Sequence, residues 1–88
     1  MVHIMVSKAN DVQKQKTANW SAWEKEPSTF AYEYPECETF YVLEGKAEIV
    51  TNTGDKCSFS VGDWVIIPRG TICNWTISEK IKKKYKFG

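Results

Sequence analysis

Hydrophobic and polar residues alternate along most of the chain in short runs. Five runs rich in β-branched and aromatic residues follow one another, at residues 39–43, 47–51, 57–60, 64–67 and 72–77. Glycines separate most of them, and we expect turns at residues 44–45, 52–55, 61–63 and 68–70. Turn signals at this spacing, with β-forming residues between them, are typical of an all-β sandwich or barrel. No stretch keeps a helical period for three turns.

The C-terminal segment, residues 80–87, is predicted to be a strand with lysines on its outer face. Ile81, Lys83, Tyr85 and Phe87 share one parity, and Lys82, Lys84 and Lys86 take the other. Exposed lysines commonly protect an edge strand from mispairing, so the lysine-rich end need not be a nucleic-acid-binding tail. Lys83 shares the parity of its apolar neighbours, and we therefore expect it to point toward the interior.

The beginning of the chain has a weaker pattern. Residues 1–19 are polar, and we expect an N-terminal arm or short strand around Ile4 and Val6, followed by a loop or helical turn. Residues 20–88 are predicted to form a single β-barrel domain. A chain of 88 residues has no room for a second core.

Composition limits the possible partners. The chain is 42% hydrophobic and 26% charged, which argues against disorder. Its net charge of +1 predicts no bulk attraction to nucleic acid or to a membrane surface. The longest apolar runs have four residues, too few to span a bilayer, and no signal peptide is recognisable. We therefore expect a cytoplasmic protein with no nucleic-acid and no membrane partner.

Cysteine and histidine content narrows the chemistry. Cys37, Cys57 and Cys73 form no CxxC pair, so a zinc ribbon is not indicated and reduced thiols are expected. The single histidine is His3, near the N-terminus. Mechanisms that need a histidine base or a His-rich metal site are therefore not expected.

Two spaced motifs carry a family resemblance. Glu38 is followed after six residues by Gly45, and residues 62–70 read G-x5-P-x-G. These motifs resemble the two signatures of the cupin superfamily, in which glycine and proline form tight corners of a small jelly-roll β-barrel. The aromatic segment 20–27 and the ending 83–85 look like compact single-domain cupins similar to the cupin domain of ureidoglycine aminohydrolase. The resemblance covers roughly residues 26–77 and implies this fold.

The resemblance also assigns the metal-binding positions of the family. The histidine positions fall on Tyr32, Tyr34 and Cys73, and only the glutamate, Glu38, is kept. First-row divalent metals prefer imidazole and carboxylate ligands, whereas phenols titrate near pH ~10. We therefore expect no tightly bound metal or other cofactor. Zinc or iron held by the remaining phenol, thiol and carboxylate groups is the weaker alternative.

Strand alternation groups these positions into a candidate pocket. If Glu38 points inward, Phe40 does too, because the two residues share one face of the strand. By the same alternation, Tyr32 and Tyr34 share one face of their strand, and Cys73 and Trp75 share one face of theirs. Convergent polar groups in apolar walls are usual for a small-molecule site. The predicted catalytic residues are Cys73, Lys83 and Glu38, and the predicted ligand-binding residues are Tyr32, Tyr34, Trp75 and Phe40.

The charged members of this pocket leave alternatives open. Glu38 and Lys83 either form an ion pair or are held apart for a ligand, because isolated buried charges are costly. Burial alone would raise the pKa of Cys73, whereas a nearby ammonium would favour its thiolate and make it a nucleophile. Cys73 could also be a small apolar filler, and the tyrosines could be core aromatics.

These observations favour a single-domain cupin that binds, and could transform, a small polar metabolite in the barrel pocket. The alternative is a non-catalytic ligand-sensing or structural dimeric β-barrel. Twelve aromatic residues among 88 are hard to bury in one small domain, so a homodimer is expected.

Overall fold

Seven β-strands, one α-helix and one short 3-10 helix make up residues 3–88, which this computed structural model describes. In chain order they are β1 (Met5–Lys8), α1 (Asp11–Lys16), η1 (Thr17–Asn19), β2 (Ser21–Lys25), β3 (Ser28–Glu33), β4 (Glu38–Thr51), β5 (Lys56–Ser60), β6 (Asp63–Ile67) and β7 (Ile72–Phe87). Within this part of the chain, no helix has the length and apolar character needed to cross a bilayer.

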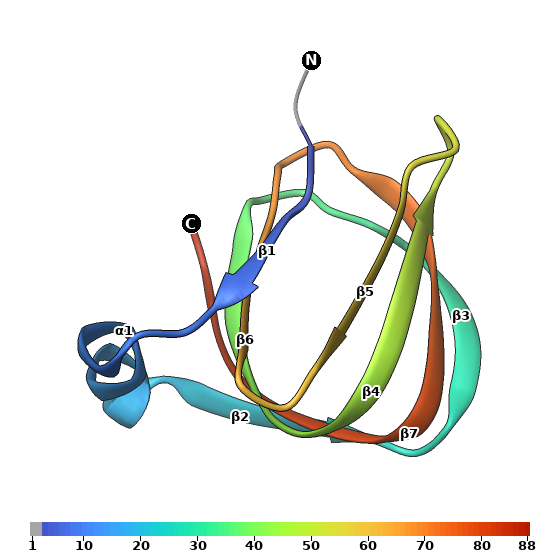
Figure 1. Cartoon of the computed structure of the whole chain (residues 1–88). Coiled ribbons are helices and arrows are strands. Elements are labelled where there is room, and N and C mark those ends of the chain that lie inside the picture. The colour runs from blue at the N-terminus through green and yellow to red at the C-terminus, as the bar shows by residue number, and fades with distance from the viewer. Residues whose placement is uncertain (1–2) are drawn as a thin grey trace.

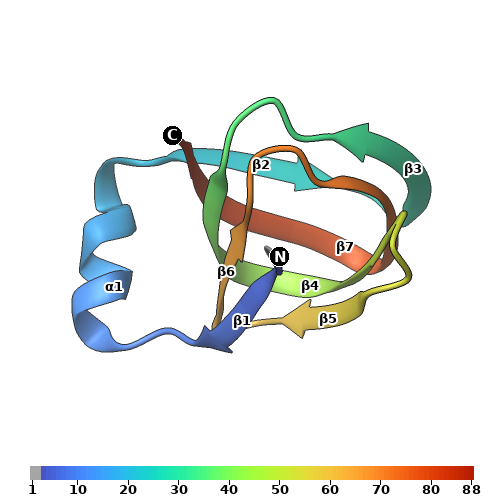
Figure 2. The same ribbon diagram turned by 90° about the horizontal axis from the view of Figure 1, so that it is seen from above.

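The strands form one antiparallel sheet that curls into a barrel (Figures 1 and 2). Its order is β1-β6-β4-β7-β2, with β3 also paired to β7 and β5 to β4. The long strand β7 pairs with β4 along most of its length, with β3 at its N-terminal end and with β2 at its C-terminal end. The predicted all-β jelly-roll barrel is confirmed.

The two longest strands cross positions where the sequence suggested breaks. The expected turn at residues 44–45 is wrong, because β4 continues through them with shifts in its pairing to β7. Gly45 has a φ of +89°, and a Cβ there would collide with the backbone carbonyl of Lys80. Glycine thus permits a bulge that bends β4 without ending it. Runs 72–77 and 80–87 likewise join into the single strand β7.

The N-terminal segment contains the expected strand and helical turn. β1 pairs with β6, from Met5 opposite Ile66 to Lys8 opposite Asp63. Helix α1 begins with a capping box in which Asn10 and Gln13 exchange side-chain to backbone hydrogen bonds. The division into an arm of residues 1–19 and a barrel of residues 20–88 stays a prediction, and residues 1–2 lie outside the described part.

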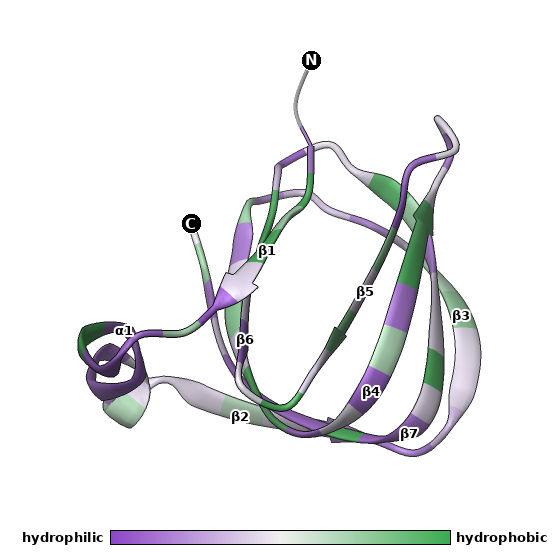
Figure 3. Cartoon of the chain, in the orientation of Figure 1, coloured by the Kyte–Doolittle hydropathy of each residue, from purple (hydrophilic) through white to green (hydrophobic). Residues whose placement is uncertain are grey.

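Alternation along the strands builds the core. Bands of hydrophobic and hydrophilic residues alternate along β4 and β7 in Figure 3. On β4, Phe40, Val42 and Ile49 are fully buried, and on β7 Ile81 is fully buried too. Lys83 has the same parity as Ile81 and is only 5% exposed, so the prediction that it points inward is confirmed.

Candidate functional site

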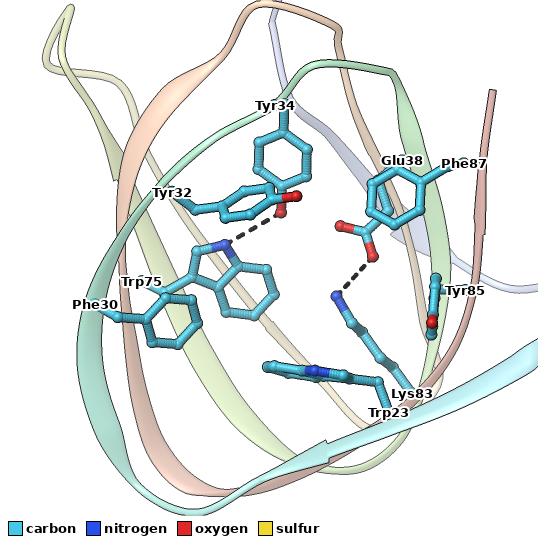
Figure 4. A pocket seen from close by; sticks show the side chains of 9 residues that line it. All are labelled: Trp23, Phe30, Tyr32, Tyr34, Glu38, Trp75, Lys83, Tyr85 and Phe87. Atoms are coloured by element: carbon cyan, nitrogen blue, oxygen red, sulfur yellow. Dashed lines mark hydrogen bonds and ion pairs between the residues drawn. The ribbon is translucent and has the colours of Figure 1, made fainter.

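A cavity of about 220 Å³ opens into the barrel between β2, β3 and the C-terminal part of β7 (Figure 4). Seven of its nine lining residues are aromatic and two are charged. We call it the aromatic pocket, and its lining residues are Trp23, Phe30, Tyr32, Tyr34, Glu38, Trp75, Lys83, Tyr85 and Phe87.

Strand register brings these side chains together from distant parts of the chain. Trp23 on β2 lies opposite Lys83 on β7, and Phe30 on β3 lies opposite Trp75. Glu38, the first residue of β4, lies opposite Phe87 near the end of β7. Strand β7 alone therefore contributes four lining residues, and all four have the same parity along the strand.

An ion pair lies at the centre of the pocket. Lys83 Nζ is 2.7 Å from Glu38 Oε2, and the two side chains are only 6% and 3% exposed. Burial lowers the pKa of Lys83, while the charge of Glu38 and its hydrogen bond oppose that change. Of the two alternatives left by the sequence, the direct pair is the one formed.

Aromatic rings surround the ammonium on its other sides. Lys83 Nζ lies 4.2 Å from the ring centroid of Phe40, 4.7 Å from that of Trp75 and 4.8 Å from that of Trp23. Ring faces attract a cation at such distances, most strongly when water is excluded. The rings and Glu38 together hold the ammonium inside a largely apolar barrel.

Tyr34 is a buried member of the pocket lining. The indole nitrogen of Trp75 donates a hydrogen bond to the Tyr34 hydroxyl at 3.2 Å. Burial, followed by the charge of Glu38, raises the pKa of Tyr34 well above its usual range, so the phenol keeps its proton. Its backbone bonds to Gly70 and Thr71 at 2.8 Å each, which anchors it to the turn before β7. Tyr32 packs against it edge-on and is 40% exposed.

Two predicted site residues lie outside this lining. Cys73 is buried, but its thiol donates to the backbone carbonyl of Tyr32 at 3.5 Å, and burial raises its pKa to about 11. Of the two alternatives left by the sequence for Cys73, these surroundings favour the protonated thiol, and its catalytic role stays a prediction. Phe40 is fully buried behind the pocket, where it packs against Phe59 and Trp75.

Comparison with known proteins places the fold in a family. A family model described as the EutQ-like cupin domain matches residues 12–85, most of the chain. The chain belongs to the EutQ-like cupin domain family. No protein of curated function matches it.

Solved structures agree with this assignment. A DUF861 family protein from Thermotoga maritima is 34% identical, with a TM-score of 0.93 over 98% of this chain and 100% of that one. The EutQ protein of Clostridium difficile is 20% identical, with a TM-score of 0.70 over 96% of this chain and 66% of that one. A putative ethanolamine utilization protein Q from Salmonella typhimurium is 17% identical, with a TM-score of 0.68 over 96% of this chain and 68% of that one. The latter two likenesses show the fold alone.

The donor atoms of this EutQ-like cupin domain do not suit the metal implied by the cupin resemblance. Glu38 is already paired with Lys83, and Tyr34 keeps its proton. The thiol of Cys73 is protonated at neutral pH and directed at a backbone carbonyl. Residues 3–88 contain no group of three or more His, Cys, Asp or Glu side chains that could hold a metal ion. The residues at the family's metal-binding positions therefore do not fit a tightly bound metal ion.

Sequence reasoning missed four lining residues. Tyr85 and Phe87 share the parity of Lys83, and Phe30 shares that of Tyr32, so alternation could have identified these three. Trp23 gave no such signal, because its place depends on the pairing of β2 with β7 across about sixty residues.

Proposed function

We propose that this EutQ-like cupin domain binds a small polar metabolite in the aromatic pocket without a tightly bound metal. The observation that carries the proposal is a charged pair, Lys83 with Glu38, facing a cavity whose other lining residues are aromatic. Apolar walls with a few convergent polar groups are the usual composition of a small-molecule site.

Stability alone is a poor explanation for the pair. Replacing a buried ion pair by well-packed apolar residues is often neutral or stabilising, because removing two charges from water is costly. Most of the other buried residues of the barrel are apolar, such as Val65 and Ile67, with Asp63 as a further buried carboxylate. Charges kept at a cavity, where a ligand can contact them, therefore favour a binding role.

The same pair supplies the candidate groups for any reaction in the pocket. Lys83 and Glu38 are an acid and a base that both line the pocket, where a bound ligand could come within the hydrogen-bond distance that proton transfer requires. The surroundings of Cys73 do not support a role in such a reaction, because its thiol lies outside the pocket lining and burial raises its pKa.

A thermal-shift screen of uncharged and zwitterionic metabolites tests the proposal. A ligand at a hundred times its Kd stabilises the folded state by roughly 2.7 kcal/mol, which raises Tm by at least roughly 10 °C in a domain of this size. The double variant Glu38→Gln/Lys83→Met should lose the shift, and Lys82→Met, on the outer face of β7, should keep it. A screen with no shift, or a shift unchanged in the double variant, would contradict the proposal.

The alternative is a non-catalytic ligand sensor or structural dimeric barrel, and a homodimer fits either function. Exposed apolar residues such as Tyr32, Ile72 and Phe87 offer surface for self-association. Sedimentation at micromolar concentration should give about twice 10.1 kDa, and a monomer would contradict the dimer. A cytoplasmic location and a closer relation to ureidoglycine aminohydrolase stay predictions of the sequence.

A further inference from the structure

We infer that the aromatic pocket selects uncharged, flat-ringed ligands that carry a carboxamide-like group, a carbonyl acceptor beside an N–H donor. The inference rests on the proposed function, because it names the ligand class for the same pocket.

The charge balance of the pocket excludes ionised ligands. Lys83 and Glu38 are the two charged members of the lining, and they neutralise each other at 2.7 Å. Both side chains are at most 6% exposed, so a third charge beside them would lose its hydration and find no free partner. Burying an unpaired charge is among the most expensive changes in a protein interior. An uncharged ligand avoids this cost.

The hydrogen-bonding capacity that remains suits a carboxamide. An ammonium has three N–H donors. Among the described residues, Lys83 Nζ donates one hydrogen bond, to Glu38 Oε2, so N–H groups of Lys83 remain for a ligand. A carboxylate has about four acceptor sites, so Glu38 keeps capacity even with the Tyr34 hydroxyl beside it. The pair thus presents donor and acceptor side by side, which matches the carbonyl and the N–H of one carboxamide.

The walls favour a flat ring of limited size. Phe30 and Trp75 lie nearly parallel, with their ring centroids 5.7 Å apart and an interplanar angle of 13°. Trp23 meets both rings edge-on. An apolar protein cavity of about 150 Å³ admits benzene, so a cavity of about 220 Å³ has room for a substituted ring. Aromatic side chains contact such rings by offset stacking and edge-to-face packing.

Three compounds of nearly identical shape test the inference: benzamide, benzoate and benzamidine. At pH 7 they are neutral, anionic and cationic, and only benzamide carries both an acceptor and a donor, so differences in Kd measured by titration calorimetry report the preference for an uncharged carboxamide. Benzamide should bind at least about tenfold more tightly than either charged compound. Equal or tighter binding of benzoate or benzamidine would overturn the inference and leave pocket binding intact. If benzamide fails while a screened metabolite binds, the inference fails alone. If neither binds, the proposed function fails as well.

Single-charge variants sharpen the test. Glu38→Gln leaves the ammonium uncompensated and should turn the preference toward benzoate, whereas Lys83→Met leaves the carboxylate and should turn it toward benzamidine. Lys82→Met should keep the wild-type order. Circular dichroism checks that each variant folds. If the single variants unfold, the order of the three compounds on the wild-type protein decides the inference: benzamide as the tightest ligand supports it, and benzoate or benzamidine as the tightest ligand contradicts it.

Discussion

Two hollows of similar size each hold a close pair of ionisable side chains, and water reaches the two pairs very differently. The aromatic pocket holds Lys83 against Glu38 at 2.7 Å, with both side chains at most 6% exposed. A second hollow, of about 180 Å³, lies at residues 3–4, 51–55 and 68–72, and we call it the polar hollow. There His3 Nδ1 lies 3.4 Å from Asp55 Oδ2, and both side chains are more than half exposed.

The two pairs differ in burial, and burial governs how strongly two ionisable side chains depend on each other. In the polar hollow, water competes for each group, and an exposed pair is worth about 0–1 kcal/mol. In the aromatic pocket, each charge depends on the other, because little water can replace a lost partner. The aromatic pocket is therefore the better candidate for selective binding, and four experiments can test the contrast.

The largest effect is expected from removing one charge of the buried pair. Lys83→Met leaves the Glu38 carboxylate buried and unpaired and should lower the free energy of unfolding by about 3–5 kcal/mol in urea titrations. Glu38→Gln/Lys83→Met should recover most of the loss. The matched control Lys82→Met, on the same strand but the other face, should change stability by less than about 0.5 kcal/mol. Equal losses in Lys83→Met and Lys82→Met would remove the contrast between inside and outside.

A pair of glycine variants compares a closely packed position of the backbone with an open one. Gly45 and Gly54 have nearly the same φ, +89° and +91°, but a Cβ at Gly45 would collide with the Lys80 carbonyl, whereas nothing lies within 4 Å at Gly54. Gly54→Ala, at the turn beside the polar hollow, should cost about 1 kcal/mol from backbone strain alone. Gly45→Ala should cost about 3 kcal/mol, because the bulge must shift as well. Similar melting temperatures for the two variants would refute the close contact.

The pH dependence of stability tests the burial of Cys73. Its pKa is raised from 9.0 to about 11 in the folded state, so between these pH values the folded chain keeps a proton that the unfolded chain releases. Stability is therefore lost as pH rises through this range, by about 2 kcal/mol relative to Cys73→Ala. The lowered pKa of Lys83 has the opposite sign but acts in both proteins, so the comparison isolates the thiol. Parallel pH curves would show that the thiol is not shielded.

The smallest effect is expected in the polar hollow. His3→Ala removes the contact with Asp55 and should change the free energy of unfolding by less than about 0.5 kcal/mol, because both groups are well solvated. A loss close to that of Lys83→Met would mean that the two hollows do not differ as described.

Local patterns in the sequence predicted the barrel and the orientation of its inner faces. The alternation 81, 83, 85, 87 placed Lys83 inside although three neighbouring lysines face outward. The resemblance to the cupin motif implied that Glu38 lies in the same interior, where it is buried. The prediction for Lys83 depends on residues close in sequence, where a period of two is readable.

Features that depend on strand pairing or side-chain length escaped the same reasoning. Cys73 has the inward parity of Trp75, but its short side chain ends at the backbone of β3 instead of the cavity. Trp23 faces the ammonium because β2 pairs with β7, and residue spacing does not reveal that partner. Gly45 was predicted to lie in a turn because glycines are common there. A glycine with positive φ fits a β-bulge equally well, and the sequence does not distinguish the two.

The pairing of β2 and β3 with β7 has a consequence for folding kinetics. In the described chain β7 is the strand partner of both, and Ser21 lies opposite Tyr85 across more than sixty residues. Native contacts this far apart in sequence require closure of long loops, which slows folding to roughly milliseconds or longer. The rings that β2 and β3 contribute to the aromatic pocket therefore reach those of β7 only when these long-range strand pairs form.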